Sequence, residues 1–539
     1  MKKHLLLIFS LLFIVQIHAQ NKRPKLVVGI VVDQMKQEYL LRFNDKFSED
    51  GFKRLQSGFF AKNAHYNYIP TSTAPGHASI YTGTSPSYHG IIGNMWYDNK
   101  TNKRVYCVED NTEKAVGGNE SSGNVSPRNL LTTTITDELK LSTNMMGKVV
   151  GVSIKDRGSA LPAGHRPDGA YWYDPKTGNF ITSTYYTHTL PKWAEDFNNK
   201  KLVKEYMKSD WVTSLPLEEY TESRSDNNTY ERLFKGKEEP TFPYKLKDLA
   251  ENASPEGLIS GTPFGNTIIL DFALAALDGE KLGADNVTDF LAISFSSTDY
   301  IGHHFGPHSI EVEDTYIKLD LEIARLLNTL DKRIGEGNYL IFLTADHAAV
   351  PNPQFLADQG MPGGFVDIEN LRKLIASGLS ESYGEGDWVN NMSSYQVFLN
   401  HAALNEKNIS INDVSAKIKS LLLSTEEVAE VYTAQDLMVP GSKTQNLLAN
   451  GFNQQRSGDI FYLFKAGYLP GKSGDRGTSH GTGYTYDTHI PILFYGKNIP
   501  NKSSIRRINI TDIAPTISML LDISLPASAT GEPIIEIFE

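Results

Sequence analysis

NYLIFLTADH, residues 338–347, is a run of apolar side chains that stops at an acid beside an imidazole. A continuous apolar run of this kind is typical of a parallel strand that is buried on both faces. In open α/β sheets, functional groups collect at the carboxyl ends of such strands. Asp346 and His347 therefore offer one oxygen and one nitrogen ligand to a divalent metal. The competing interpretation is an acid that caps the next helix beside a surface histidine, and this pair alone does not decide between the two.

Two other apolar strands end in an acid. KLVVGIVVD stops at Asp33, and FLAISFSSTD stops at Asp299. His303 lies four residues after Asp299, an interval at which both side chains can reach one metal from a turn or a first helical turn. His304 and His308 are also close, and the interval does not exclude them. One aspartate after a strand is often only a helix cap, so it is the repetition that favours a metal site.

A glycine-rich loop near the end of the sequence, GTSHGT, presents a further histidine, His480, with His489 beside the strand IPILFY as the alternative. Together the strand ends and this loop supply six oxygen and nitrogen ligands and no thiolate: Asp33, Asp299, His303, Asp346, His347 and His480. Two sites of three mixed carboxylate and imidazole ligands suit zinc and leave a position open for a reactant. Two such metals, roughly 3.5–4 Å apart, can hold the attacking and leaving oxygens of an in-line displacement.

The segment YIPTSTAPGHASIYTG predicts a proline turn that brings hydroxyl residues to the start of a helix, with Pro75 in its first turn. A hydroxyl there meets free backbone N–H groups and the positive end of the helix dipole, which suits a phosphate. A plain Ser or Thr cap is the simpler interpretation, and a threonine becomes a nucleophile only with a base or a metal nearby. We interpret His77 as structural. Asn94 follows a glycine-rich turn and can donate its amide to an anion.

A fourth strand, KVVGVSIKDR, carries cations at its end. Lys155 and Arg157 lie two residues apart and share a face while the chain stays extended. Two cations at a strand end in a cleft suggest a clamp for a dianion, in which the arginine offers a planar fork. Solvated surface charge is the alternative.

The first residues have the pattern of a secretory signal. Two lysines precede an apolar run from Leu5 to Val15, which is too short to span a bilayer, and Ala19 precedes Gln20. No cysteine lies near this point, and no later stretch is long and apolar enough to act as an anchor. We therefore expect a soluble protein without a membrane anchor, exported to the periplasm or secreted.

Composition narrows the function further. The single cysteine, Cys107, allows no internal disulfide. A net charge of −11 weighs against nucleic-acid binding, which requires a basic surface. A chain of 539 residues exceeds the usual size of one compact domain, so insertions are expected.

We predict a signal peptide at 1–19, a catalytic core in three parts at 20–170, 259–347 and 471–539, an insertion near the site at 171–258, and a second insertion or cap at 348–470.

Six motifs in this order, IPTSTAPGHASIYTG, HGIIGN, KDR, STDYIGHHFGP, TADH and GTSHG, resemble the alkaline phosphatase superfamily, and most closely its PafA-type bacterial alkaline phosphatases. The resemblance runs over nearly the whole chain after the signal. It implies an α/β three-layer sandwich with a central, mostly parallel sheet and two inserted cap segments. It also implies an enzyme with two Zn²⁺ per chain that hydrolyses many phosphate monoesters, among them sugar phosphates, nucleotides and aryl phosphates, and releases inorganic phosphate. We expect a monomer.

The resemblance also implies roles that spacing alone did not assign. The third hydroxyl of Thr71-Ser72-Thr73 matches a nucleophile that forms a phosphothreonine intermediate, and His480 matches a ligand in preference to His489. One departure is Ala348, which follows the TADH motif where many relatives have a glycine. The implied site is as follows: one zinc ion on Asp33, Asp346 and His347; the other on Asp299, His303 and His480; and the non-bridging phosphoryl oxygens on Asn94, Lys155 and Arg157.

The nearest alternative is a phosphodiesterase or nucleotide pyrophosphatase of the same superfamily, which shares the ligands, the threonine and the asparagine. A monoester carries more charge on its non-bridging oxygens than a diester, so Lys155 and Arg157 favour the monoester. Sulfatases use a modified Cys or Ser in a C/S-x-P-x-R motif, which this sequence lacks. From another class, a zinc-containing binding protein without catalysis finds no support, because ligands and nucleophile are all present.

Overall fold

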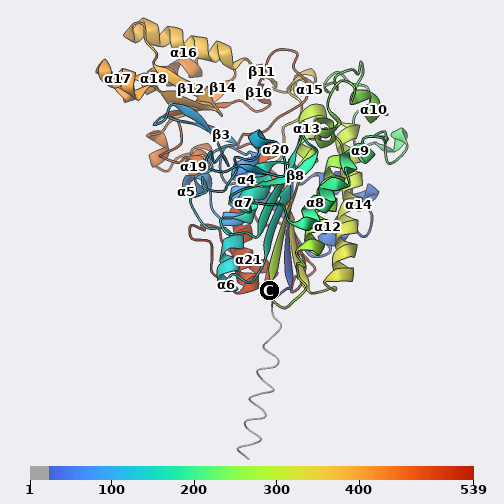
Figure 1. Cartoon of the computed structure of the whole chain (residues 1–539). Helices are drawn as coiled ribbons and strands as arrows, with labels where there is room; N and C mark the ends of the chain where they lie inside the picture. The colour runs from blue at the N-terminus through green and yellow to red at the C-terminus, as the bar shows by residue number, and fades with distance from the viewer. Residues whose placement is uncertain (1–22) are drawn as a thin grey trace, which may run out of the picture.

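One large sheet runs through the middle of the molecule (Figure 1). The structure is a computed structural model that describes residues 23–539, so the predicted signal peptide lies outside the described residues. In order across the sheet, the strands are β18 (Lys502–Ser504), β2 (Phe59–His65), β17 (His489–Gly496), β10 (Tyr339–Thr344), β1 (Leu26–Val32), β9 (Asp289–Phe295), β6 (Val149–Ser153), β7 (Gly169–Asp174), β8 (Asn179–Ser183) and β5 (Ala115–Val116), and β19 (Ile508–Asn509) pairs with β2.

The four strands predicted to carry chemistry are β10, β1, β9 and β6, and they are direct neighbours in this sheet. They are parallel to one another, whereas β17 pairs with β10 in the opposite direction. Every residue of β1 is buried, because its Val and Ile side chains suit a pleated strand whose two faces are both covered. Since neighbouring parallel strands end at the same edge, the fold brings Asp33, Asp299 and Asp346 to one place.

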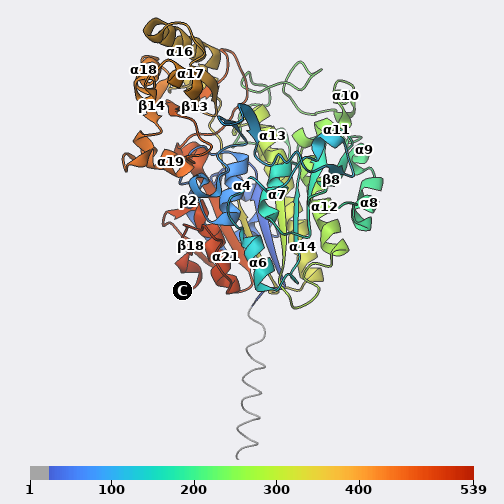
Figure 2. The same ribbon diagram turned by 60° about the vertical axis from the view of Figure 1, so that its left-hand side comes forward.

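Helices cover both faces of the sheet, which makes the three-layer α/β architecture expected from the sequence (Figure 2). The two layers are α4 (Thr73–Thr82), α6 (Ile135–Ser142), α7 (Asp156–Ala163) and α21 (Ile513–Leu521) on one side, and α8 (Lys192–Asn199), α12 (Phe264–Gly279) and α14 (Ile310–Arg333) on the other. Ser309 caps α14 by accepting a hydrogen bond from the backbone N–H of Val312 at 3.1 Å.

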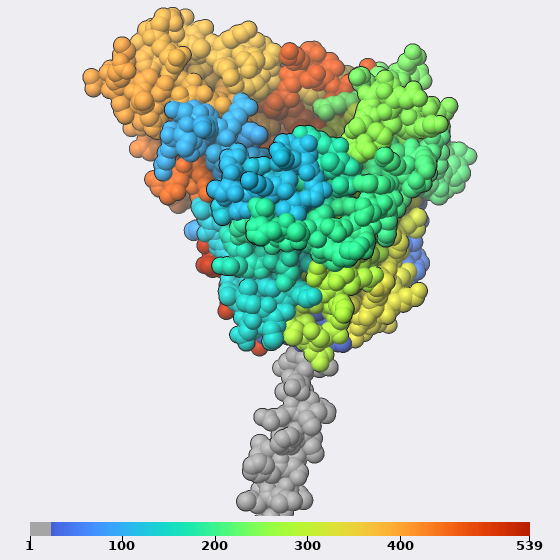
Figure 3. Space-filling view, in the orientation of Figure 1, coloured from blue at the N-terminus to red at the C-terminus, as the bar shows by residue number. Residues whose placement is uncertain are grey.

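A smaller lobe stands at the upper left of Figure 1 and rises beside a recess in the surface (Figure 3). Its elements are the strands β12 (Val389–Ser393), β13 (Gln396–Leu399), β15 (Ile460–Phe464) and β14 (Val428–Thr433), in that order in their sheet, and the helices α16 (Ile368–Tyr383), α17 (His401–Glu406) and α18 (Ile411–Leu423). Buried side chains such as Leu379, Val397 and Ile418 form an apolar core apart from that of the main sheet. Where the chain enters and leaves the lobe, β11 (Gly364–Val366) and β16 (Tyr468–Pro470) pair in parallel. The lobe lies within the predicted second insertion.

The predicted insertion at 171–258 differs from the structure at its beginning. β7 and β8 are strands of the main sheet, so the chain remains in the core to the end of β8. Tyr171, Trp172 and Tyr173, at the start of the predicted insertion, are buried strand residues of β7. The rest of the segment contains the short helices α8, α9 (Leu202–Tyr206), α10 (Leu246–Leu249) and α11 (Pro255–Leu258), and the long stretch between α9 and α10 is irregular apart from one 3-10 turn, Leu217–Glu219.

Within residues 23–539, no single helix has the length and apolar character needed to cross a membrane. One pair of helices, Pro255–Gly261 and Phe264–Gly279, meets the requirement jointly by length and composition, but it bends by 98° at the break.

Candidate active site

Three carboxylates meet at the carboxyl edge of the sheet. Asp33 directly follows β1, Asp346 follows the end of β10, and Asp299 lies in the first turn of α13 (Ser297–Phe305), the helix after β9. Asp33 and Asp346 are fully buried, and Asp299 is 4% exposed. Charges removed from water are costly unless cations lie close by, so this arrangement calls for positive partners.

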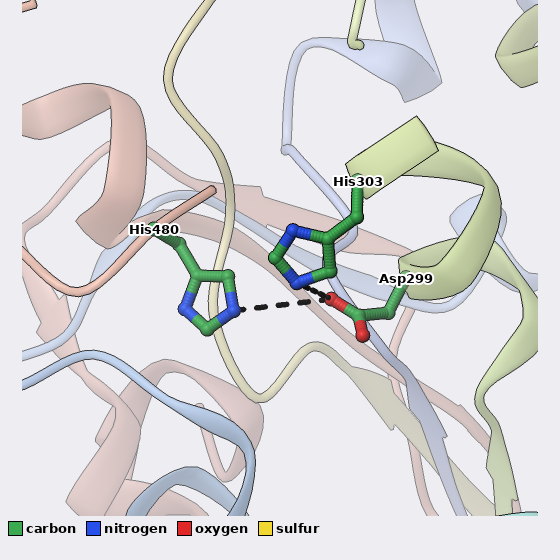
Figure 4. A group of neighbouring side chains, drawn as sticks. All are labelled: Asp299, His303 and His480. Atoms are coloured by element: carbon green, nitrogen blue, oxygen red, sulfur yellow. Dashed lines mark ion pairs between the residues drawn. The ribbon is translucent and has the colours of Figure 1, made fainter. Parts of the chain in front are cut away.

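Asp299, His303 and His480 point toward one another (Figure 4). Nε2 of His303 lies 3.2 Å from Oδ1 of Asp299, and Nε2 of His480 lies 3.9 Å from the same oxygen. His303 is one helical turn after Asp299 on α13, while His480 comes from the loop after β16. The three ligand atoms lie within 4.8 Å of one another, which is close enough to hold one metal ion. One predicted ligand set is thus assembled by the fold.

The second group of ligand atoms in the structure does not have the same three members as the predicted set of Asp33, Asp346 and His347. Here the three residues whose ligand atoms lie within 4.8 Å of one another are Asp33, Asp299 and His347. Nε2 of His347 is 3.5 Å from Oδ1 of Asp33 and 3.7 Å from Oδ2 of Asp346. Asp346 therefore borders this group, and Asp299 belongs to both. The rings of His347 and His480 stack with centroids 3.4 Å apart, so the two groups form one continuous site.

The three histidines present the same nitrogen to the site. In each ring, Nδ1 bonds to a backbone carbonyl oxygen: His303 to Thr478 (2.8 Å), His347 to Ala348 (3.0 Å) and His480 to Thr71 (2.7 Å). An Nδ1 that donates leaves the lone pair on Nε2, the form in which imidazole binds a metal. Burial lowers the pKa of His347 to about 3, so this ring is neutral. Ala348 contributes only its carbonyl here, so its departure from the usual glycine leaves the ligand in place.

Three buried atoms of the site have no hydrogen-bond partner within residues 23–539. They are Oδ1 of Asp33, Oδ2 of Asp346 and Nε2 of His347. Unpaired buried polar atoms are rare because each costs free energy, and cations among them would satisfy all three. Burial, and then the charge of Asp33, raise the pKa of Asp346 well above its ordinary value. This set of carboxylate oxygens and neutral imidazole nitrogens fits zinc.

The predicted nucleophile and the predicted amide donor lie beside the start of α4. Thr73 is the first residue of this helix and is 1% exposed. Asn94 accepts a hydrogen bond from the backbone N–H of Ala74 through Oδ1 at 2.8 Å. That bond holds the Asn94 amide next to the positive end of the helix, where its Nδ2 can donate to an anion.

The cationic pair does not have the predicted geometry. Helix α7 starts inside the KDR motif, so Lys155 is its extended N-cap and Arg157 is already helical, and the two do not share an extended face. Nζ of Lys155 lies 2.6 Å from a carboxylate oxygen of both Asp33 and Asp299. Burial opposes the charge of Lys155, but these carboxylates outweigh it and raise its pKa. Arg157 donates to the Tyr106 hydroxyl at 3.1 Å.

Gln34 lies in the middle of the site and was not predicted. Its Nε2 donates to Oδ1 of Asp299 at 2.6 Å, and its backbone N–H donates to Oδ1 of Asp346 at 3.1 Å. Its φ of 66° is in the left-handed region, which residues other than glycine seldom adopt. Gly302 makes room for it, since a Cβ there would lie 2.0 Å from Oε1 of Gln34. The only signal in the sequence is its position directly after Asp33.

Three histidines that spacing left open lie outside both ligand groups. His304 stacks on Phe234 with ring centroids 4.7 Å apart. His308 packs near Phe355, with 6.0 Å between the ring centroids. His489 bonds through Nε2 to a backbone carbonyl of β2 at 3.0 Å.

Helix α4 lies directly against the end of β10. A Cβ on Gly76 would lie 2.3 Å from the backbone oxygen of Asp346, so only glycine permits this approach. His77 ties the helix to its surroundings, because its Nδ1 lies 2.9 Å from the carbonyl oxygen of Thr73 and its Nε2 2.9 Å from the Ser294 hydroxyl. Backbone packing therefore sets the distance from Thr73 to the ligand groups.

Comparison with known proteins shows relatives over almost the full length of the chain. The family described as type I phosphodiesterase / nucleotide pyrophosphatase matches residues 27–485. Alkaline phosphatase PafA of Elizabethkingia meningoseptica is 47% identical over 96% of this chain and 94% of its own. Alkaline phosphatase PhoV of Synechococcus elongatus is 44% identical over 96% and 93%, and a protein of Myroides odoratus named calcium-transporting ATPase is 45% identical over 96% and 95%.

The crystal structure of wild-type alkaline phosphatase PafA matches with a TM-score of 0.92 and 46% identity, covering 96% of this chain and 99% of that chain. A second matching structure is a PafA variant in which one threonine, one asparagine, one lysine and one arginine are substituted. The first two and the last two of those positions are separated by the same intervals as Thr73 and Asn94, and as Lys155 and Arg157, in this chain.

We expect Gly76→Ala to lower the free energy of unfolding by about 1–3 kcal/mol, the usual cost of forcing an extra atom into a packed position. The added Cβ would overlap the backbone of Asp346. Gly261→Ala is the matched control, since a Cβ there comes no closer than 3.6 Å to its neighbours. Denaturant unfolding of both variants measures the difference. Equal stability of Gly76→Ala and the unaltered protein would mean that α4 does not depend on this contact.

Proposed function

The chain belongs to the alkaline phosphatase superfamily, among its PafA-type members, and on that premise we propose that it is an exported two-zinc alkaline phosphatase that hydrolyses phosphate monoesters through a phosphothreonine. One observation carries the proposal: three buried carboxylates and three histidines that present Nε2 to them gather in one site next to the start of α4, where Thr73 lies.

The described residues offer places for both zinc ions. Asp299, His303 and His480 would hold one, and Asp33 and His347, with Asp346 beside them, would hold the other. The buried atoms without partners and the neutral imidazole of His347 support this assignment. Zinc at such sites supplies Lewis acidity, which favours ionisation of a hydroxyl and offsets the charge on attacking and leaving oxygens.

The residues around Thr73 would carry out the transfer of the phosphoryl group. Oγ1 of Thr73 gives up its proton and attacks phosphorus in line with the ester oxygen, the phosphorus–oxygen bond to the alcohol breaks, and the leaving alcohol oxygen takes up one proton in exchange. Water then attacks the phosphothreonine, the bond to Oγ1 breaks, one proton of the water returns to Oγ1, and inorganic phosphate is released. Asn94, whose Oδ1 is bonded to the N–H of Ala74, donates through Nδ2 to the phosphoryl oxygens and stabilises the charge that spreads over them.

Lys155 supports a monoester as the substrate. It is a buried, charged lysine inside the site, and a monoester carries one more negative charge than a diester. Arg157, at the start of the same helix, has a buried Nε without a partner among the described residues and is the second candidate for binding that charge. A phosphodiesterase is the second candidate function, because the family description that matches the chain names that activity.

We further propose the setting of the enzyme. Residues 1–19 would be a signal peptide removed on export to the periplasm or the medium, and the mature protein would be a monomer without a membrane anchor. Its substrates would be small sugar phosphates, nucleotides and aryl phosphates; the net charge of −11 argues against nucleic acid as a partner. The division into core and two insertions stands as proposed, with β7 and β8 moved to the core.

Zinc dependence and substrate class can be tested together. We expect kcat/KM for an aryl phosphate monoester to exceed that for the matching methyl diester by at least about 10- to 100-fold, the effect of one or two charge-assisted hydrogen bonds. Chelation should abolish both activities, and zinc should restore them. A preference for the diester in the zinc-loaded protein would place the chain with the phosphodiesterases.

Thr73→Ala should reduce monoester turnover by about 10³-fold or more, because no other group takes over a covalent step. Its zinc content, measured by elemental analysis, should remain that of the unaltered protein. Ser72→Ala is the control, since it removes the neighbouring hydroxyl, which makes no capping bond. Substantial turnover by Thr73→Ala would rule out the phosphothreonine.

The double variant Lys155→Ala, Arg157→Ala should lose much more kcat/KM on the monoester than on the diester, because only the monoester presents the additional charge. Lys140→Ala is a suitable control, as Lys140 is also a buried lysine but pairs at 2.9 Å with Asp168, away from the site. Equal losses on the two substrates would show that these cations do not recognise the dianion.

A further inference from the structure

A cavity of about 380 Å³ lies beside the candidate active site. Its volume falls in the range of pockets that hold small organic ligands. Large aromatic and aliphatic side chains line much of the cavity: Ile154, Tyr173, Phe234, Leu258, Tyr300 and His304. None of them belongs to the ligand groups, so the chemistry described above leaves this cavity unused.

Two residues that line the cavity, Tyr300 and Ile154, are sequence neighbours of residues in the candidate active site. Tyr300 directly follows Asp299 on α13, and the centroid of its ring lies 5.2 Å from Nζ of Lys155. Ile154 directly precedes Lys155 at the end of β6. A substrate whose phosphoryl group lies at Lys155 therefore has this cavity next to it, across the Tyr300 ring.

The lining suits a flat ring with a polar edge. Phe234 and His304 stack at an interplanar angle of 22°, and Tyr300 is 41% exposed. Nε2 of His304 is buried and has no hydrogen-bond partner within residues 23–539. This imidazole nitrogen can exchange a hydrogen bond with a heteroaromatic edge. Aromatic faces bind flat rings by stacking.

We propose that this cavity binds the alcohol portion of the substrate when that portion carries a flat aromatic ring, as in a nucleoside or an aryl phosphate. The proposal rests on the phosphatase function and adds a preference to it. It also gives the part of the insertion after β8 a role, because Phe234 and Leu258 come from it.

The test compares AMP with ribose 5-phosphate, which share the same phosphate ester and differ in the base. For Phe234→Ala, we expect kcat/KM for AMP to fall about 5- to 100-fold, the usual effect of losing one stacking partner, with a change below about twofold for ribose 5-phosphate. Phe234→Tyr keeps the stacking ring and should behave like the unaltered protein.

Gly261→Phe provides a second, independent variant. Gly261 lines the cavity, and a Cβ on it would meet the Phe234 ring at 3.6 Å, so the new side chain would fill the space. It should reduce AMP hydrolysis and spare ribose 5-phosphate. If both substrates lose equally, or neither changes, in Phe234→Ala and Gly261→Phe, the cavity is not a subsite. If the unaltered, zinc-loaded protein hydrolyses neither substrate, it is the phosphatase function that fails.

Discussion

The repulsion among three carboxylates, buried together at one edge of a parallel sheet, is the constraint on which the rest of the structure depends. Taking each of these charges out of water costs several kcal/mol unless it is compensated. The chain supplies part of the compensation: Lys155 pairs with Asp33 and Asp299, and Gln34 donates to Asp299 and Asp346. Oxygens of Asp33 and Asp346 still lack partners among the described residues. Cations bound among these oxygens would supply the remaining compensation, so the same ions would serve both stability and catalysis.

The four strands and the aspartates near their ends could be predicted from the sequence, because a strand buried on both faces is a long apolar run whose polar end is easy to locate, and the structure brings all six candidate ligands into one site. Features that depend on how separate strands and helices pack together could not be predicted from the sequence. Asp299 is shared between the two ligand groups because β9 lies beside β1, an adjacency that no local pattern encodes. The predicted shared face of Lys155 and Arg157 was wrong because α7 begins at Asp156, between the two residues, so the chain is no longer extended there. Gln34 escaped notice because a left-handed glutamine leaves no signature in composition.

The two segments outside the main sheet relate to the site in different ways. The first lines the cavity beside Tyr300, on the side where a leaving alcohol would extend. The second folds around its own apolar core, yet its hairpin between β12 and β13 reaches the loop that carries His480: a Cβ on Gly481 would lie 3.1 Å from the ring of Tyr395. Variation in the first segment would alter which esters bind, whereas variation in the second would alter how firmly that loop is held.

The bond from His480 to the carbonyl of Thr71 joins residues 409 positions apart in the chain. Contacts between such distant segments form late, since the entropy of closing so long a loop must first be overcome. During synthesis, the strands that carry the three aspartates emerge well before this histidine does. A partly made chain therefore has its acidic groups without the last imidazole, and a metal ion that it met would find an incomplete set of ligands. The sequence order itself thus leaves the group of Asp299, His303 and His480 incomplete until the polypeptide is nearly finished, whereas the residues of the other group are all present once His347 has been added.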